Sequence, residues 1–339
     1  MKKLLLLFVV SFPITGLTQL TENFFEMNIS EINLKGKVKS ITQSKYKTKE
    51  KFGEIKKKSL VTKWVLKQDE NGNKTEQANY NSSWELYYFH KTSSKLDENG
   101  NEVERAYYNS DGSLDSKYTK KHDDNGNKIE VKEYGSDGSL REKKTYKYDD
   151  NGNKTEISEY NPNGSLSSKS IYKYDDNGNE IERAHYYSDG SLFSKEVYKY
   201  DRNGNKTEES YYNSRKVLRY KHTYKYNEIG NKIEFASFNS DGSLKKKKTY
   251  KYDDNGNLIE MNRYKSNGDL YWKYAYTYDS YDNMIEETKY NSKERLKRKI
   301  TYNYEYDCHS NWINKSILKW KSGVPKTKEI TEREIEYYD

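Results

Sequence analysis

Residues 149–174 read DDNGNKTEISEYNPNGSLSSKSIYKY, and variants of this unit recur through most of the chain. Its clearest marker is the five-residue turn DDNGN. Copies of this turn, some of them decayed, begin at positions 69, 97, 123, 149, 175, 201, 227, 253, 279 and 307. Successive copies lie 26 residues apart, except for first and last steps of 28. A fixed period of this size is typical of repeat architectures, in which no single unit can bury its apolar side alone.

Each unit contains two strand-like segments and two turns. In the quoted unit the segments are 154–160 and 166–174, rich in aromatic and β-branched residues. The second turn places Pro162 where a type I turn favours proline and Gly164 where the chain needs a positive φ. Gly152 has the same role in DDNGN. Both turns therefore predict hairpins with three-residue loops.

These hairpins predict an all-β fold, a continuous antiparallel β-hairpin meander of about 20 strands. Large sheets twist, and they coil or close rather than staying flat. We expect a curved or coiled single-layer sheet or shell, with capping hairpins at its two ends and tyrosines on its concave side.

The loop length also predicts which side chains share a face, because strand register fixes the faces. Three-residue loops place Tyr160 opposite Leu166, and Glu156 opposite Tyr146. On this pairing the recurring Tyr, Leu and Glu residues share one packed face, and each Glu accepts a hydrogen bond from a tyrosine. The other face carries most of the residues that vary between units.

Four parts are predicted along the chain. Residues 1–18 are expected to form a signal peptide, because Lys2 and Lys3 precede a short apolar run that ends before the small residues Gly16 and Thr18. The run is too short for a membrane span. Residues 19–68 are an N-terminal capping hairpin region, 69–306 form nine repeat units, and 307–339 form a C-terminal capping repeat. The protein is therefore expected to be exported, to the periplasm, the cell surface or the medium.

The composition fits a thin, ordered fold. Only 32% of residues are hydrophobic and 34% are charged, values that alone would indicate disorder. The 36 tyrosines argue against disorder, since large amphipathic rings can replace an aliphatic core. The net charge of +8 is modest, and Lys and Glu alternate in columns rather than clustering. We therefore expect no nucleic-acid partner.

The recurring Tyr-x-Tyr-Asp-x-x-Gly-Asn, as in residues 146–153, resembles the YD repeat of the Rhs family of bacterial secreted and surface proteins. The resemblance covers residues 69 to about 312. It implies a β-shell and a secreted location. In that family the shell can enclose a toxin domain, but we expect no further C-terminal domain in this chain, and residues 69–312 lack an arginine- and glycine-rich core segment. The resemblance implies no toxicity for this chain.

Residues suited to catalysis or metal binding have simpler structural explanations. The DDNGN loops differ from a calcium loop in the position of Gly and in placing a tyrosine, such as Tyr134, where a bidentate Glu is required. The glutamates recur identically in every unit, which is unlike a single pair of catalytic carboxylates. The five histidines occupy unrelated columns. We therefore predict no enzyme activity, no catalytic residue, no cofactor and no metal.

Function is expected on the variable face. The predicted register places His185 opposite Phe193, Tyr211 opposite Arg219, and Arg263 opposite Tyr271. The candidate ligand contacts are Phe193, Tyr211, Arg219, Arg263, Tyr271 and Trp272. Such pairs could contact a protein or a glycan at the cell surface, or serve only as ordinary cross-strand pairs.

The sequence thus favours an exported, non-enzymatic β-repeat protein that acts as a binding or structural surface in the cell envelope. One alternative is a carbohydrate-binding protein that uses exposed aromatic residues. A third is an accessory shell-type protein related to Rhs toxins but lacking a toxin domain.

Overall fold

A computed structural model describes residues 34–51, 54–70, 74–321 and 324–338. The predicted signal peptide, residues 1–18, lies outside the described residues. The chain divides into two units, Met1–Lys35 and Gly36–Asp339, and all strands belong to the second. No helix of the described segments has the length and hydropathy of a membrane span. The proposed boundaries of the four sequence parts remain predictions.

The described residues form 22 strands in one antiparallel sheet. In chain order they are β1 Val38–Lys51, β2 Glu54–Gln68, β3 Lys74–Tyr80, β4 Leu86–Leu96, β5 Glu102–Tyr108, β6 Leu114–His122, β7 Lys128–Gly135, β8 Leu140–Tyr148, β9 Lys154–Tyr160, β10 Leu166–Tyr174, β11 Glu180–Tyr187, β12 Leu192–Tyr200, β13 Lys206–Asn213, β14 Leu218–Tyr226, β15 Lys232–Asn239, β16 Leu244–Tyr252, β17 Leu258–Tyr264, β18 Leu270–Tyr278, β19 Met284–Asn291, β20 Leu296–Tyr306, β21 Trp312–Lys321 and β22 Val324–Tyr337. The predicted antiparallel hairpin meander is confirmed.

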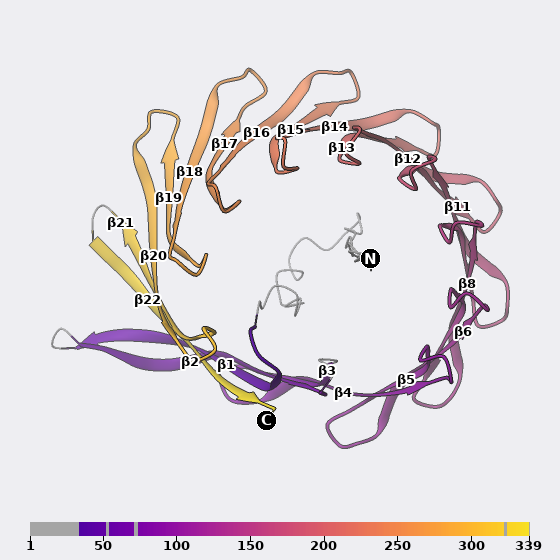
Figure 1. Cartoon of the computed structure of the whole chain (residues 1–339), viewed down its shortest axis with the longest axis horizontal. Helices are drawn as coiled ribbons and strands as arrows, with labels where there is room; N and C mark the ends of the chain where they lie inside the picture. Colours follow the sequence, from indigo (N-terminus) through magenta and orange to yellow (C-terminus); the bar gives the residue numbers. More distant parts are fainter. Residues whose placement is uncertain (1–33, 52–53, 71–73, 322–323, 339) are drawn as a thin grey trace, which may run out of the picture. The chain divides into compact units, whose positions relative to one another are not determined.

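The predicted curved sheet with a capping hairpin at each end does not remain open, because the first and last strands pair with each other. Ile41 of β1 lies opposite Leu66 of β2 on one side and opposite Ile335 of β22 on the other. The sheet of Gly36–Asp339 therefore closes into a β-barrel, and Figure 1 shows its strands following one another around a ring. The terminal hairpins close the sheet instead of capping it. Closure removes the two free edges that an open meander would leave unpaired.

Apolar side chains are buried at the seam between β22 and β1 and on the adjoining strand β2. The side chain of Ile41 is 0% exposed and that of Leu66 is 3% exposed. Arg333 of β22 donates from Nε to Gln43 Oε1 at 2.9 Å, and its guanidinium lies 3.3 Å from the centre of the Trp312 ring. Close packing here compensates for bringing together strands from opposite ends of the chain.

The predicted three-residue loops are confirmed at both turns. In the first, Asp149 N–H donates to Asn153 O at 2.9 Å, and Gly152 has φ 80°. In the second, Asn161 N–H donates to Ser165 O at 2.9 Å, and Gly164 has φ 83°. A positive φ is costly for residues with a Cβ atom, which explains why glycine recurs at these positions.

A feature that the sequence analysis missed is a second bulge just after each turn. Tyr148 pairs with Lys154, but the next pair is Lys147 with Glu156, so Thr155 is an extra residue on its strand. One extra residue exchanges the two faces for the rest of the strand. Tyr160 does pair with Leu166, as predicted. Glu156, however, lies opposite Lys147 rather than Tyr146, and the predicted Tyr, Leu and Glu face is wrong in that respect.

The observed register defines two faces, which we name from β9 and β10. The glutamate face carries Glu156, Ser158, Tyr160, Lys169 and Ile171 and their equivalents in other units. The tyrosine face carries Ile157, Glu159, Ser168, Ser170 and Tyr172 and their equivalents.

A ladder of ion pairs covers the glutamate face. Glu156 contacts Lys147 Nζ of the preceding strand at 3.1 Å and Lys169 Nζ of the following strand at 3.3 Å. The same two-lysine arrangement occurs at Glu104, Glu130, Glu182, Glu208, Glu234 and Glu260. The predicted ladder of Glu–Tyr hydrogen bonds is therefore replaced by Glu–Lys pairs. Between these charges lie small, buried residues such as Ser158 and Ala184.

Candidate functional site

The tyrosine face carries the greatest variation between units. Positions equivalent to Ser170 hold Lys144, Glu196, His222 and Lys248 in neighbouring units. The glutamate face, in contrast, repeats Glu and Lys almost without change. The candidate site is therefore sought on the tyrosine face.

The structure places the six predicted contact residues in two settings. Tyr211, Arg263 and Trp272 lie on the tyrosine face, where Tyr211 pairs with Tyr220 and Arg263 pairs with Trp272. The other three are the extra residues of the bulges. These are Phe193, Arg219 and Tyr271.

Because of these bulges, the predicted cross-strand partners are wrong. His185 faces Ser194 rather than Phe193, and Tyr211 does not face Arg219. One predicted contact nevertheless forms diagonally, since the Arg263 guanidinium lies 5.4 Å from the centre of the Tyr271 ring.

Aromatic rings form a continuous run across β13, β14 and β15. Tyr211 stacks on Tyr220 at 5.0 Å between ring centres, and Tyr220 stacks on His222 at 4.8 Å. His222 then contacts Phe235 at 5.2 Å. Stacked rings on a sheet face are rigid and amphipathic, which suits them to contact a partner as well as to hold the strands together.

A polar cluster adjoins this run. Glu209 accepts from Lys206 Nζ at 3.1 Å and from Tyr224 Oη at 3.2 Å, and His222 Nδ1 lies 3.7 Å from its carboxylate. The nearby His222 imidazole, together with the charge of Lys206, lowers the pKa of Glu209 to about 2 despite burial. The carboxylate is thus held in its ionised form.

This lowered pKa predicts how the stability depends on pH. A carboxyl group whose pKa falls on folding stabilises the folded state above its unfolded pKa, here near 4.5, and the contribution is lost as the pH falls toward 2. At about pH 7 we expect the variant Glu209→Gln to lower the free energy of unfolding by on the order of 2–3 kcal/mol. The difference should shrink steadily below about pH 4.5 in urea titrations. An unchanged difference at about pH 3 would contradict the ionised pairing.

A second cluster lies on β15–β19, and the sequence analysis named only three of its members, Arg263, Tyr271 and Trp272. We name it the basic patch, and it comprises Lys232, Lys246, Lys248, Arg263 and Lys289 with the rings of Phe235, Tyr250, Tyr271, Trp272 and Tyr274. Lys289 Nζ lies 3.9 Å from the centre of the Trp272 ring. A correct register would have revealed this patch, since the run of lysines in 245–248 is visible in the sequence.

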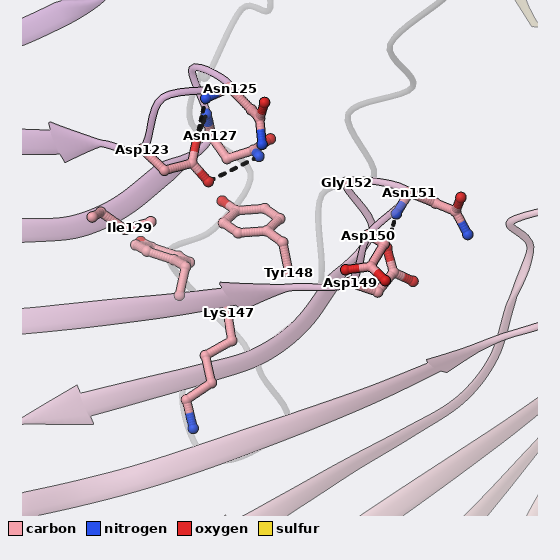
Figure 2. Close-up of a pocket in the computed structure, with 11 residues that line it drawn as sticks. Asp123, Asn125, Asn127, Ile129, Lys147, Tyr148, Asp149, Asp150, Asn151 and Gly152 are labelled. Carbon is pink, nitrogen blue, oxygen red and sulfur yellow. Dashed lines mark hydrogen bonds between the residues drawn. The ribbon is translucent and has the colours of Figure 1, made fainter.

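The DDNGN turns form shallow pockets between neighbouring units. One such pocket, of about 730 Å³, lies between the turns at Asp123 and Asp149. Figure 2 shows Tyr148 reaching toward the Asp123 turn while Lys147 points away from it. The Tyr148 hydroxyl donates to Lys128 O at 2.8 Å, which ties neighbouring hairpins together.

The turn carboxylates are engaged within their own loops. Asp123 Oδ1 accepts from the N–H groups of Asn125 at 3.0 Å and Asn127 at 2.8 Å, and Oδ2 accepts from Asn127 Nδ2 at 3.1 Å. This geometry supports the interpretation of DDNGN as a turn motif. Across the described part of the chain, no three His, Cys, Asp or Glu side chains are grouped as metal ligands.

Comparisons with known proteins give only distant likenesses. No model of a known protein family matches the chain, and no curated protein matches it. The solved structures that resemble it include TcdB2-TccC3 without the hypervariable C-terminal region, with 15% identity over 83% of this chain and 16% of that chain, at a TM-score of 0.35. The Tc holotoxin pore of Photorhabdus luminescens has 12% identity over 78% of this chain and 19% of that chain, at a TM-score of 0.29.

A porin-like protein from Bacteroides uniformis has 9% identity over 88% of this chain and 96% of that chain, at a TM-score of 0.26. The chain spans less than a fifth of the two Tc toxin chains. These likenesses concern β-sheet architecture alone and indicate no activity for this chain. The likeness to YD repeats remains a resemblance.

Proposed function

We propose that the chain is an exported, non-enzymatic β-repeat protein, in which the closed sheet presents the tyrosine face as a binding surface. The observation that carries this proposal is the engagement of its recurring polar groups. Glu156 is held by two lysines, Asp149 by its own turn, and the Tyr148 hydroxyl by a backbone carbonyl. Side chains that stabilise the sheet and its turns in this way are poorly placed to act on a substrate. The tyrosine face, in contrast, varies from unit to unit.

The exported location follows from the predicted signal peptide and can be tested directly. Cells expressing the full chain should yield protein outside the cytoplasm, with an N-terminus created by cleavage near Thr18. The variant Leu5→Arg/Leu6→Arg interrupts the apolar run and should keep the uncleaved chain inside the cell. Wild-type protein found in the cytoplasm with an intact N-terminus would contradict export.

A carbohydrate-binding role is the second candidate, because some aromatic side chains near the hairpin ends are well exposed. Phe193 is 50% exposed and Tyr187 is 49% exposed, and their rings meet edge to face at 5.2 Å. Tyr271, beside Trp272, is 40% exposed. Exposed rings of this kind can stack on sugars.

A glycan array separates the two candidates. Saturable binding of a neutral glycan that is lost in Phe193→Ala, or in Tyr271→Ala and Trp272→Ala, would support the carbohydrate role. Lys245→Ala, at an equivalent bulge position without a ring, is the matched control. No binding across the array would favour a protein partner or a purely structural role.

A further inference from the structure

On β15–β18 the basic patch has no acidic side chain on its own face, and on β19 the one carboxylate that shares the face with Lys289, that of Glu287, is held by Arg298. The strands β15–β18 contain only two acidic residues, Glu234 and Glu260. Both point to the glutamate face, where each is held by two lysines. Among the described residues, none of the five cations of the patch forms an ion pair with a carboxylate.

Two cations of the patch face each other across neighbouring strands. Lys248 of β16 lies directly opposite Arg263 of β17. At the equivalent place four units earlier, Lys144 lies opposite Glu159, and the two form an ion pair at 2.9 Å. Like charges directly opposite destabilise a sheet, whereas opposite charges stabilise it. The chain can therefore build the stabilising pair at this position and has a repulsive one in the patch.

The repulsion between the cations of the patch also affects a third cation, Lys246. Burial, together with repulsion from Lys248, Arg263 and Lys245, lowers the pKa of Lys246. The patch thus has a positive field that no carboxylate of β15–β18 offsets on its own face. A negatively charged partner would remove this repulsion.

The rings of the patch already carry cations. Lys289 lies over Trp272 at 3.9 Å, Arg263 over Tyr271 at 5.4 Å, and Lys246 over Phe235 at 5.5 Å. Stacking by nucleic-acid bases or sugar rings needs open ring faces. Here those faces hold ammonium and guanidinium groups, which suits a partner that brings carboxylates to the cations.

The residue types of the patch also match protein interfaces. Tyr, Trp, Phe, Met and Arg are enriched at such interfaces, and Trp, Tyr and Arg supply most of their binding energy. The patch contains four of these types, and the fifth is adjacent to it, since Met261 lies between Tyr250 and Tyr274.

We propose that the basic patch binds an acidic segment of a partner protein, whose carboxylates meet Lys246, Lys248, Arg263 and Lys289 while its apolar side chains pack beside the rings. This site deepens the proposed function, since it names the class of partner for the same tyrosine face.

The test uses the purified full chain and a labelled synthetic peptide in which Glu segments alternate with Leu-Ser segments. Binding is measured by fluorescence anisotropy. The control peptide has every Glu replaced by Gln. The acidic peptide should bind, more weakly as salt is added, and the amide peptide should not. Equal binding of the two peptides would overturn the proposal.

The decisive variants are Lys248→Gln and Arg263→Glu, with Lys144→Gln as the matched control. The first two should weaken binding of the acidic peptide by at least ~10-fold, the third by less than ~2-fold, because Lys144 is already paired with Glu159. Arg263→Glu should melt at or above the wild-type temperature, since it restores the opposite-charge pair. Loss of binding that comes with a lower melting temperature would indicate damage to the fold and would contradict the proposal.

Two further ligands test the choice of partner. Alginate oligomers and a single-stranded oligothymidine of matched charge should bind more weakly than the acidic peptide. Tighter binding of either would overturn the assignment to a protein segment. These results are independent of the export experiment, so failure of the patch and failure of the proposed location can be told apart.

Discussion

Deletion of residues 149–174, one whole unit, should leave a stably folded protein, whereas deletion of residues 161–174 should strongly destabilise the fold. The first deletion removes β9 and β10 and rejoins Tyr148 to the next DDNGN turn at Asp175. It leaves an even number of strands, so β1 and the last strand still meet antiparallel. The circumference falls by only two strand spacings, about 10 Å, and the strain is spread over the whole sheet.

The second deletion removes β10 alone and leaves an odd number of strands. The first and last strands would then run in the same direction, and pairs such as Ile41 with Ile335 could not form. We expect this variant to aggregate through its free edges or to melt lower by roughly 10 °C or more. Thermal melting and size-exclusion chromatography measure both outcomes. Equal stability of the two deletions would contradict closure by antiparallel pairing.

The second large effect is expected at Ile41. This side chain is 0% exposed at the seam, so Ile41→Asp buries an unpaired carboxyl group and leaves a cavity. We expect a loss of about 3–5 kcal/mol in the free energy of unfolding, measured by urea titration. The control is Ile233→Asp, at a bulge position that is 37% exposed, where the expected loss is below about 1 kcal/mol. Similar losses at the two sites would show that the seam is not a buried core.

The local structure could be predicted from the sequence because turn chemistry is local. Gly152, Gly164 and Pro162 specify their loops by backbone preferences that do not depend on distant residues. The pairing of Tyr160 with Leu166 followed from the same turn.

The faces could not be predicted, because each depends on a bulge without its own sequence signal. Thr155 and Ser167 are the extra residues of two such bulges, and neither is a glycine or proline. A register without these bulges exchanges the two faces and separates Glu156 from its lysines. It also conceals the contrast between the Lys144–Glu159 and Lys248–Arg263 pairs.

Closure of the sheet also could not be predicted from the repeat alone. A periodic sequence specifies how each unit contacts the next, and the same contacts fit an open or a closed array. Whether the sheet closes depends on the irregular strands β1 and β22. Their pairing joins residues nearly 300 positions apart, such as Ser40 and Glu336. No local preference encodes such a contact.

A cross-link between β1 and β22 tests the closed sheet most directly. Thr42 and Glu334 are direct partners in the seam, and paired Cα atoms of antiparallel strands lie within the range that a disulfide spans. In a Cys308→Ser background, Thr42→Cys/Glu334→Cys should oxidise rapidly to an intramolecular disulfide. The control Thr42→Cys/Glu196→Cys, which joins β1 to β12, should not. Oxidation of the seam pair no faster than that of the control would contradict the closed sheet.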